Sequence, residues 1–272
     1  MKKIILAPHP DDELVGLAGM IATSENPEEF HVIYTSDGAP VVPEWYPIAG
    51  CKTPDEYRAT RRAEAKAGCA YLSIPEEHLH FLEFSDFTLA DNLNGLADTL
   101  TALFHVIRPT EIYIPALEKG HPDHDATHIA GWAAIKRMRN AGMAIRAYAF
   151  AEYALIDGKE AFNKFPDVNT CQVHLLTQEI IEKKKQALYL HTSQLGEKND
   201  WMSRYFMECT REAIMPLFNY DPVQLFHHLL HVPCYFEMIY SLPISSSTID
   251  QKLLTFATLE QKHKIDPVST IK

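Results

Sequence analysis

The sequence has too few basic residues and too little organised cysteine for several common classes of protein. Lysine and arginine number 25 against 36 aspartate and glutamate, and the formal net charge of −11 argues against non-specific binding to nucleic-acid phosphates. The five cysteines are odd in number, widely separated and without a C-x-x-C pair, so neither a disulfide framework nor a cysteine zinc site is predicted. A reducing compartment, the cytoplasm, is therefore expected.

Long apolar runs, internal repeats and nucleotide-binding motifs are also absent. No window approaches the length of a membrane span, and the apolar stretch at the amino terminus ends in acids before it could serve as a signal peptide. Neither G-x-G-x-x-G nor a Walker lysine motif is present, so no nucleotide cofactor is predicted. At 272 residues, the chain is long enough for one large globular domain with an appendage.

The first half of the sequence alternates short apolar strands with helical patterns. The expected strands are residues 3–7, 29–36, 80–84, 111–115 and 144–153. The expected helices are residues 11–24, 53–68, 89–107 and the second half of 118–140. This alternation predicts βαβ units and a Rossmann-like, three-layer α/β fold, with a mostly parallel sheet of strand order 3-2-1-4-5.

The alternation weakens in the second half of the sequence. A further strand is expected at residues 171–177 and a helix at 178–191. We therefore predict one domain over residues 1–200 and a carboxyl-terminal extension, residues 201–272, that packs on the same domain.

Three consecutive acids, Asp11, Asp12 and Glu13, follow the first apolar strand within the stretch APHPDDE. Adjacent carboxylates repel one another and resist burial, so a folded protein keeps them near its interior only when positive charge compensates them. A helix amino terminus is the simpler explanation, since its dipole favours acids. A bound metal ion is the alternative, because it would supply the missing charge.

A second polar motif, GHPDH, follows the fourth expected strand. In a sheet of order 3-2-1-4-5 the first and fourth strands are neighbours at the point where the strand order reverses, which is where ligands bind. The two motifs should therefore converge. His9, Asp12 and His124 would then supply two imidazoles and one carboxylate, a common catalytic zinc set that leaves one position open for water.

APHPDDE and GHPDHDATH together resemble the LmbE/PIG-L-like family of zinc-dependent N-deacetylases, whose members typically remove acetyl from N-acetylglucosamine-type sugars. The resemblance extends through TSDG at residues 35–38, an R-x-x-E pattern at Arg61 and Glu64, and HTSQ at residues 191–194. It covers about the first two hundred residues. It implies a hydrolase that acts on a small N-acetylated amino sugar or glycoside.

The resemblance also implies roles for individual residues. It implies that His9, Asp12 and His124 are the metal ligands. Asp11 is then the general base, which takes a proton from zinc-bound water and passes it to the leaving amine. His121 supports the tetrahedral oxyanion together with the metal. Asp123 orients an imidazole as an outer carboxylate.

Two further residues are candidates for substrate contact. Arg61 matches the family pattern, although a helix salt bridge explains it equally well, and Asp86 could hold sugar hydroxyls, although a turn explains it more simply. Lys119, two residues ahead of His121, could attract an acidic substituent or stay solvated.

Other functions are compatible with the same residues. Two histidines and a carboxylate also form the facial triad of non-haem Fe(II) enzymes, so Fe²⁺ or another divalent ion is an alternative to Zn²⁺. A deacylase of another small N-acyl amide, or a sugar- or metal-binding protein without turnover, would also keep the ligands. Retention of both Asp11 and His121 argues against the last of these. A homo-oligomer is compatible with the sequence.

Overall fold

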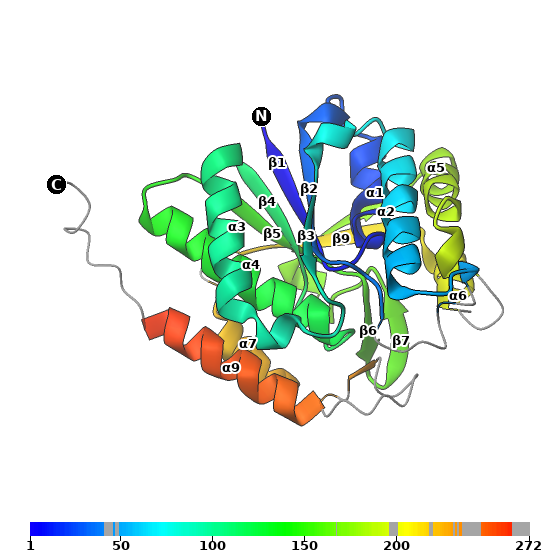
Figure 1. The fold of residues 1–272 in the computed structure, drawn as a ribbon. Coiled ribbons are helices and arrows are strands. Elements are labelled where there is room, and N and C mark those ends of the chain that lie inside the picture. Colours follow the sequence, from blue (N-terminus) through cyan, green and yellow to red (C-terminus); the bar gives the residue numbers. More distant parts are fainter. Residues whose placement is uncertain are drawn as a thin grey trace.

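The computed structural model describes residues 1–40, 46, 49–166, 168–195, 201–217, 220–230, 232, 234–235 and 246–262. Helices cover both faces of a central sheet in these residues (Figure 1). The strands of the sheet are β1 (Lys3–Ala7), β2 (Phe30–Ser36), β3 (Leu79–Phe84), β4 (Glu111–Pro115), β5 (Arg146–Phe150), β8 (Gln172–Leu175) and β9 (Arg211–Pro216). A separate hairpin is formed by β6 (Tyr153–Ile156) and β7 (Lys159–Phe162).

The helices alternate with the first five strands and then gather in the second half of the chain. They are α1 (Asp12–Ala22), α2 (Pro54–Tyr71), α3 (Leu93–Ile107), α4 (Pro122–Asn140), α5 (Gln178–Tyr189), α6 (Trp201–Glu208), α7 (Pro222–Leu229) and α9 (Ser246–Lys262). None of the helices in the described part of the chain has the length and apolar character that a membrane span requires.

The sheet has the strand order β3-β2-β1-β4-β5-β9-β8. The pairs among the first five strands are all parallel, which confirms the predicted α/β fold and the order 3-2-1-4-5. β9 pairs antiparallel with β5, and β8 pairs antiparallel with β9. Residues 211–216 of the expected extension therefore lie inside the sheet, where no strand was predicted.

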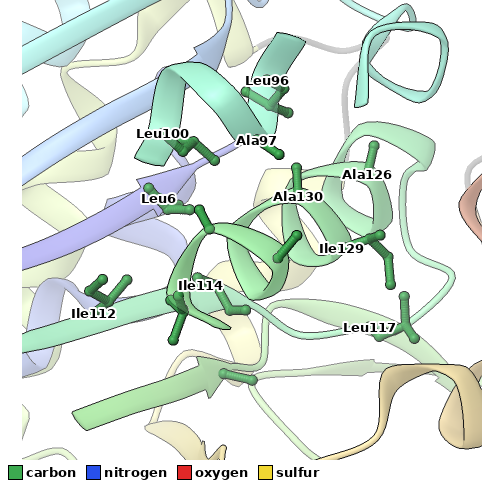
Figure 2. Close-up of a cluster of buried hydrophobic side chains, with 14 of the residues drawn as sticks. Leu6, Leu96, Ala97, Leu100, Ile112, Ile114, Leu117, Ala126, Ile129 and Ala130 are labelled. Atoms are coloured by element: carbon green, nitrogen blue, oxygen red, sulfur yellow. The ribbon is translucent and has the colours of Figure 1, made fainter. Parts of the chain in front are cut away.

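Alternate side chains of the central strands enter two separate cores, because successive residues of a strand point to opposite faces. Ile4 and Leu6 of β1 pack toward α3 and α4, whereas Ile5 and Ala7 pack toward α1, α2 and α5. Figure 2 shows Leu6 near Leu100 of α3 in the first of these cores. A parallel strand covered on both faces reads as a continuous apolar run, which is why β1 was recognisable from the sequence.

His128 of α4 is buried as a neutral imidazole in the first core. Its Nδ1–H donates to the carbonyl of Pro115 at 2.7 Å, and the Tyr220 hydroxyl donates to its Nε2 at 2.8 Å. Burial lowers the pKa of His128 from 6.5 to about 4. Between these two pKa values, His128 binds a proton in the unfolded chain but not in the folded protein. The folded state therefore loses stability as the pH falls through this range.

We expect this group alone to remove about 2 kcal/mol from the free energy of unfolding between pH 7 and pH 5. Urea denaturation of the native protein and of His128→Asn at both pH values measures the effect, because Asn does not titrate there. The difference between the two pH values should be smaller in the variant. The free energies of unfolding at the two pH values are compared within each protein, so a constant loss of packing energy in the variant cancels. Equal differences would show that His128 is not the group responsible.

Candidate active site

The two polar motifs meet at one edge of the sheet. β1 and β4 are hydrogen-bonded parallel neighbours, so the chain leaves both strands at their carboxyl ends on the same side. β1 leads into α1 through residues 8–11, and β4 leads into α4 through residues 116–121. The strand order thus brings together side chains that lie more than a hundred residues apart in the sequence.

Three buried donor atoms form a nearly equilateral triangle at this edge. His9 Nδ1 lies 3.2 Å from Asp12 Oδ2, Asp12 Oδ2 lies 3.3 Å from His124 Nε2, and the two imidazole nitrogens are 3.3 Å apart. Bonds of 2.0–2.2 Å in a tetrahedral zinc site place the ligand atoms about 3.3–3.6 Å apart. The donor types and their separations therefore fit a divalent ion such as Zn²⁺.

Other groupings of histidines and carboxylates occur around the same point. They are His9, His121 and His124; His9, Asp86, His121 and Asp123; and Asp12, His124 and Glu152. In each of these groups the possible ligand atoms lie within 4.8 Å of one another. The triangle has separations of 3.2–3.3 Å, and the second nitrogen of each of its imidazoles faces another carboxylate.

Asp86 and Asp123 lie behind His9. The Oδ1 atom of Asp86 is 3.1 Å from His9 Nε2, and an oxygen of Asp123 is 3.8 Å from the same nitrogen. Asp123 also accepts the backbone N–H groups of Phe87, at 2.7 Å, and Leu89, at 3.3 Å. A carboxylate on Nε2 fixes the ring so that Nδ1 faces the triangle. Asp86, expected at the substrate, thus lies against an imidazole of the triangle.

The carboxylates around His9 have a larger combined effect on its pKa than its burial has. Burial by itself lowers the pKa of His9, but Asp86 and Asp12 raise it, and the net shift is well above the ordinary value. The pKa of Asp12 is held well below its ordinary value, because the attraction of His124 and His9 overcomes burial. Without an ion, the His9 imidazole supplies positive charge to the surrounding carboxylates. A metal ion would take over that role.

Glu152 and Tyr153 lie beside His124 and were missed by the sequence analysis. Glu152 is fully buried, its Oε2 is 3.6 Å from His124 Nδ1, and neither of its oxygens accepts a hydrogen bond from the described residues. The Tyr153 hydroxyl is 3.3 Å from His124 Nε2. Glu152 lies two residues after β5, the parallel neighbour of β4, and Tyr153 is the first residue of β6. That position at the end of a third parallel strand was the available signal.

Asp11 lies outside the triangle and is paired with Arg61. Its Oδ1 accepts from Arg61 Nη2 at 2.7 Å, and the guanidinium also donates to the carbonyls of Pro10 and Gly38, each at 3.2 Å. Both side chains are buried. Burial raises the pKa of Asp11, and Arg61 opposes the shift without cancelling it. Arg61, expected at the substrate, thus pairs with the carboxylate of Asp11 beside the triangle.

Gly38, the last residue of TSDG, has no side chain and so allows the backbone to lie close to Pro10 and Arg61. Its φ of +61° is in the left-handed region, and a Cβ there would lie 2.6 Å from Cδ of Pro10. A side chain at this position would press on the loop that carries Asp11. The glycine therefore serves the site as well as the turn.

His121 is the residue that precedes α4 and caps it. Its Nδ1 accepts the backbone N–H of Asp123 at 3.1 Å, so the neutral ring carries its proton on Nε2. Burial, reinforced by the neighbouring His9, holds the pKa of His121 well below its ordinary value. The ring centroids of His121 and His9 are 4.6 Å apart. The local structure thus presents a neutral N–H donor beside the triangle.

Glu64, one turn after Arg61 on α2, holds the HTSQ segment. Its carboxylate accepts the Thr192 hydroxyl at 2.9 Å, the Ser193 N–H at 2.7 Å and the Ser193 hydroxyl at 2.5 Å. The R-x-x-E and HTSQ elements of the sequence are therefore linked through α2. Arg61 of this helix pairs with Asp11, and Glu64, one turn later, binds residues 192–193.

The fold of this chain is similar to that of several solved structures. The zinc-inhibited form of teicoplanin deacetylase Orf2 has a TM-score of 0.61 at 17% identity, over 79% of this chain and 97% of that one. N,N'-diacetylchitobiose deacetylase from Pyrococcus horikoshii has a TM-score of 0.58 at 18% identity, over 88% of both chains. GalB, the 4-carboxy-2-hydroxymuconate hydratase from Pseudomonas putida, has a TM-score of 0.59 at 18% identity, over 80% and 97%.

At these identities the structural likeness shows the fold alone, and the hydratase illustrates that one fold hosts more than one reaction. No curated protein matches the sequence. Residues 4–135, which contain both motifs, match the family described as PIG-L: GlcNAc-PI de-N-acetylase. The resemblance to the PIG-L, or LmbE-like, de-N-acetylase family that the two motifs predicted is thereby confirmed for this chain.

Proposed function

We propose that this protein is a metal-dependent hydrolase that removes the N-acetyl group from an N-acetylglucosamine-type amino sugar or glycoside. The observation that carries the proposal is the triangle of His9, Asp12 and His124 donor atoms with Asp11, a carboxylate outside the triangle, next to it in the sequence. The family match over residues 4–135 supports de-N-acetylation as the reaction. A cytoplasmic location and a homo-oligomeric state stay predictions from the sequence.

His9, Asp12 and His124 would hold the ion, and Zn²⁺ suits two imidazoles and one carboxylate in a tetrahedral arrangement. When bound, the ion supplies Lewis-acid activation of the attacking water and of the amide carbonyl. The protein supplies the orientation: Asp86 and Asp123 direct His9, and Glu152 lies behind His124.

Asp11 is the general base of the proposed reaction. It accepts a proton from the attacking water and then returns a proton to the departing amine, so the C–N bond breaks with a neutral leaving group. Arg61 holds this carboxylate through Nη2 at 2.7 Å. We therefore assign Arg61 to positioning the base.

His121 supplies the donor for the developing negative charge. Because Nδ1 accepts the N–H of Asp123, the Nε2–H is the group that can donate to the carbonyl oxygen as it becomes an oxyanion. The Tyr153 hydroxyl, 3.3 Å from His124 Nε2, borders the proposed metal site.

Metal removal tests the proposal. We expect dialysis against a chelator to abolish the release of free amine from an N-acetylglucosamine derivative, and one equivalent of Zn²⁺ per chain to restore it. Fluorescamine labelling of the product amine, alongside the zinc content, measures both. Unchanged amine release by metal-free protein would contradict the proposal. Restoration by Fe²⁺ alone, with oxygen uptake, would favour the non-haem iron alternative.

A further inference from the structure

The loop that enters the site, residues 116–121, is held by the carboxyl-terminal part of the chain. The ammonium group of Lys119 pairs with Asp250 of α9 at 2.5 Å, and both side chains are buried. The N–H of Tyr235 donates to the carbonyl of Lys119 at 2.8 Å, and the thiol of Cys234 donates to the carbonyl of Gly120 at 3.7 Å. All three contacts come from outside the segment that matches the family.

Lys119 adopts a conformation that needs such support. Its φ of +58° is in the left-handed region, which a residue with a side chain adopts only when its surroundings enforce it. A buried ammonium group likewise requires a charged partner, because an unpaired charge in the interior is strongly destabilising. Asp250, 131 residues further along the chain, supplies that partner. The ammonium group thus faces α9, whereas the sequence left open either an acidic substituent of the substrate or solvent as its partner.

The same residue is tied to the first turn of α4. The backbone N–H groups of Glu118 and Lys119 both donate to Asp125 Oδ1 at 3.2 Å. Lys119 therefore bridges α9 and α4 two residues before His121. A change in the path of the loop would move His121 more than His124, because His124 already lies within α4.

We propose that Asp250 is a positioning residue that, through Lys119, fixes loop 116–121 and thereby the direction of the His121 imidazole. The helix α9 is then part of the catalytic apparatus, and it packs against α4 and α7 at the base of the molecule in Figure 1. The catalytic consequence rests on the proposed deacetylase function. The structural consequence, that Asp250 orders loop 116–121, is independent of that function.

Glu260 provides a matched control on the same helix. Its carboxylate pairs with Arg137 of α4 at 2.6 Å and is largely buried, so it also anchors α9 to α4. Its hydrogen-bond partners among the described residues, Lys136 and Arg137, both lie in α4 and outside loop 116–121. Asp250→Asn and Glu260→Gln each remove one ion pair of α9, but only the first removes a contact to the loop.

The experiment compares these variants by amide hydrogen exchange and by steady-state kinetics with zinc-loaded protein. We expect Asp250→Asn to speed exchange at residues 118–121 and to lower kcat by about tenfold to a hundredfold, because misplacing a catalytic group by about 1 Å costs this much. KM and zinc affinity should change less than twofold. Glu260→Gln should leave both the loop exchange and kcat close to the native values.

A double variant, Lys119→Met with Asp250→Asn, removes both charges and so avoids burying an unpaired ammonium group if the single variant does not fold. It should reproduce the faster exchange and the lower kcat. Equal behaviour of the Asp250 and Glu260 variants in exchange and in kcat would overturn the proposal. If native protein with bound zinc releases no amine, the deacetylase function fails, and hydrogen exchange alone decides whether Asp250 orders the loop.

Discussion

Replacing Asp11 by asparagine is expected to lower kcat by at least about a hundredfold while the zinc content stays at the native level. Asparagine keeps the shape of the side chain but cannot take a proton from water or return one to the amine. The triangle of donor atoms does not include Asp11, so metal binding should persist. The measurement is kcat for amine release, normalised to the zinc content of each preparation.

Asp55→Asn is the control for the loss of a carboxylate that pairs with an arginine of α2. Asp55 pairs with Arg58 at 2.6 Å on the exposed side of the helix. This variant should keep the native kcat, since exposed ion pairs contribute little and Asp55 lies away from the site. An Asp11→Asn protein that binds zinc and keeps the native kcat would show that Asp11 is not the base.

Replacing His124 by alanine is expected to abolish activity by a different route, the loss of the metal. Two of the three donor atoms would remain, and even loss of an outer partner of a metal ligand typically weakens binding by 10–100-fold. We therefore expect zinc affinity to fall by more than about a hundredfold. Competition with a zinc-binding dye measures this affinity without any substrate.

His128→Asn is the matched control on the same helix, one turn further along. His128 bonds to Pro115 and Tyr220 and not to the triangle. This variant should therefore bind zinc with native affinity. Native zinc affinity in His124→Ala would contradict the assignment of the ligands, and the group of His9, Asp86, His121 and Asp123 would become the alternative.

The parts of the fold that were predictable are those whose signal is local. β1 is apolar on both faces, and α2 begins where Thr53 accepts the N–H of Glu56 and Pro54 takes the first helical position. β9 was not predictable, because its burial depends on pairing with β5 and β8 and its short sequence shows no periodicity of its own. Pairing between distant segments leaves no local pattern.

The candidate site divides in the same way. The two motifs specify which residues gather, because the order of parallel strands brings the ends of β1 and β4 together. They do not specify which partners the long charged side chains bind. Arg61 turns to Asp11, and Lys119 turns to Asp250, since in each case a buried partner from another element attracts the charge. Such choices depend on tertiary packing and could not be predicted from spacing.

The most direct test of the proposed function measures two products in one reaction. Zinc-loaded protein is incubated with N-acetylglucosamine derivatives that carry different aglycones, and free amine and acetate are both quantified. A deacetylase releases them in equal amounts, and zinc-loaded Asp11→Asn protein should release neither at a comparable rate. Native protein with one zinc per chain that releases neither product from any derivative would contradict the N-acetylglucosamine assignment.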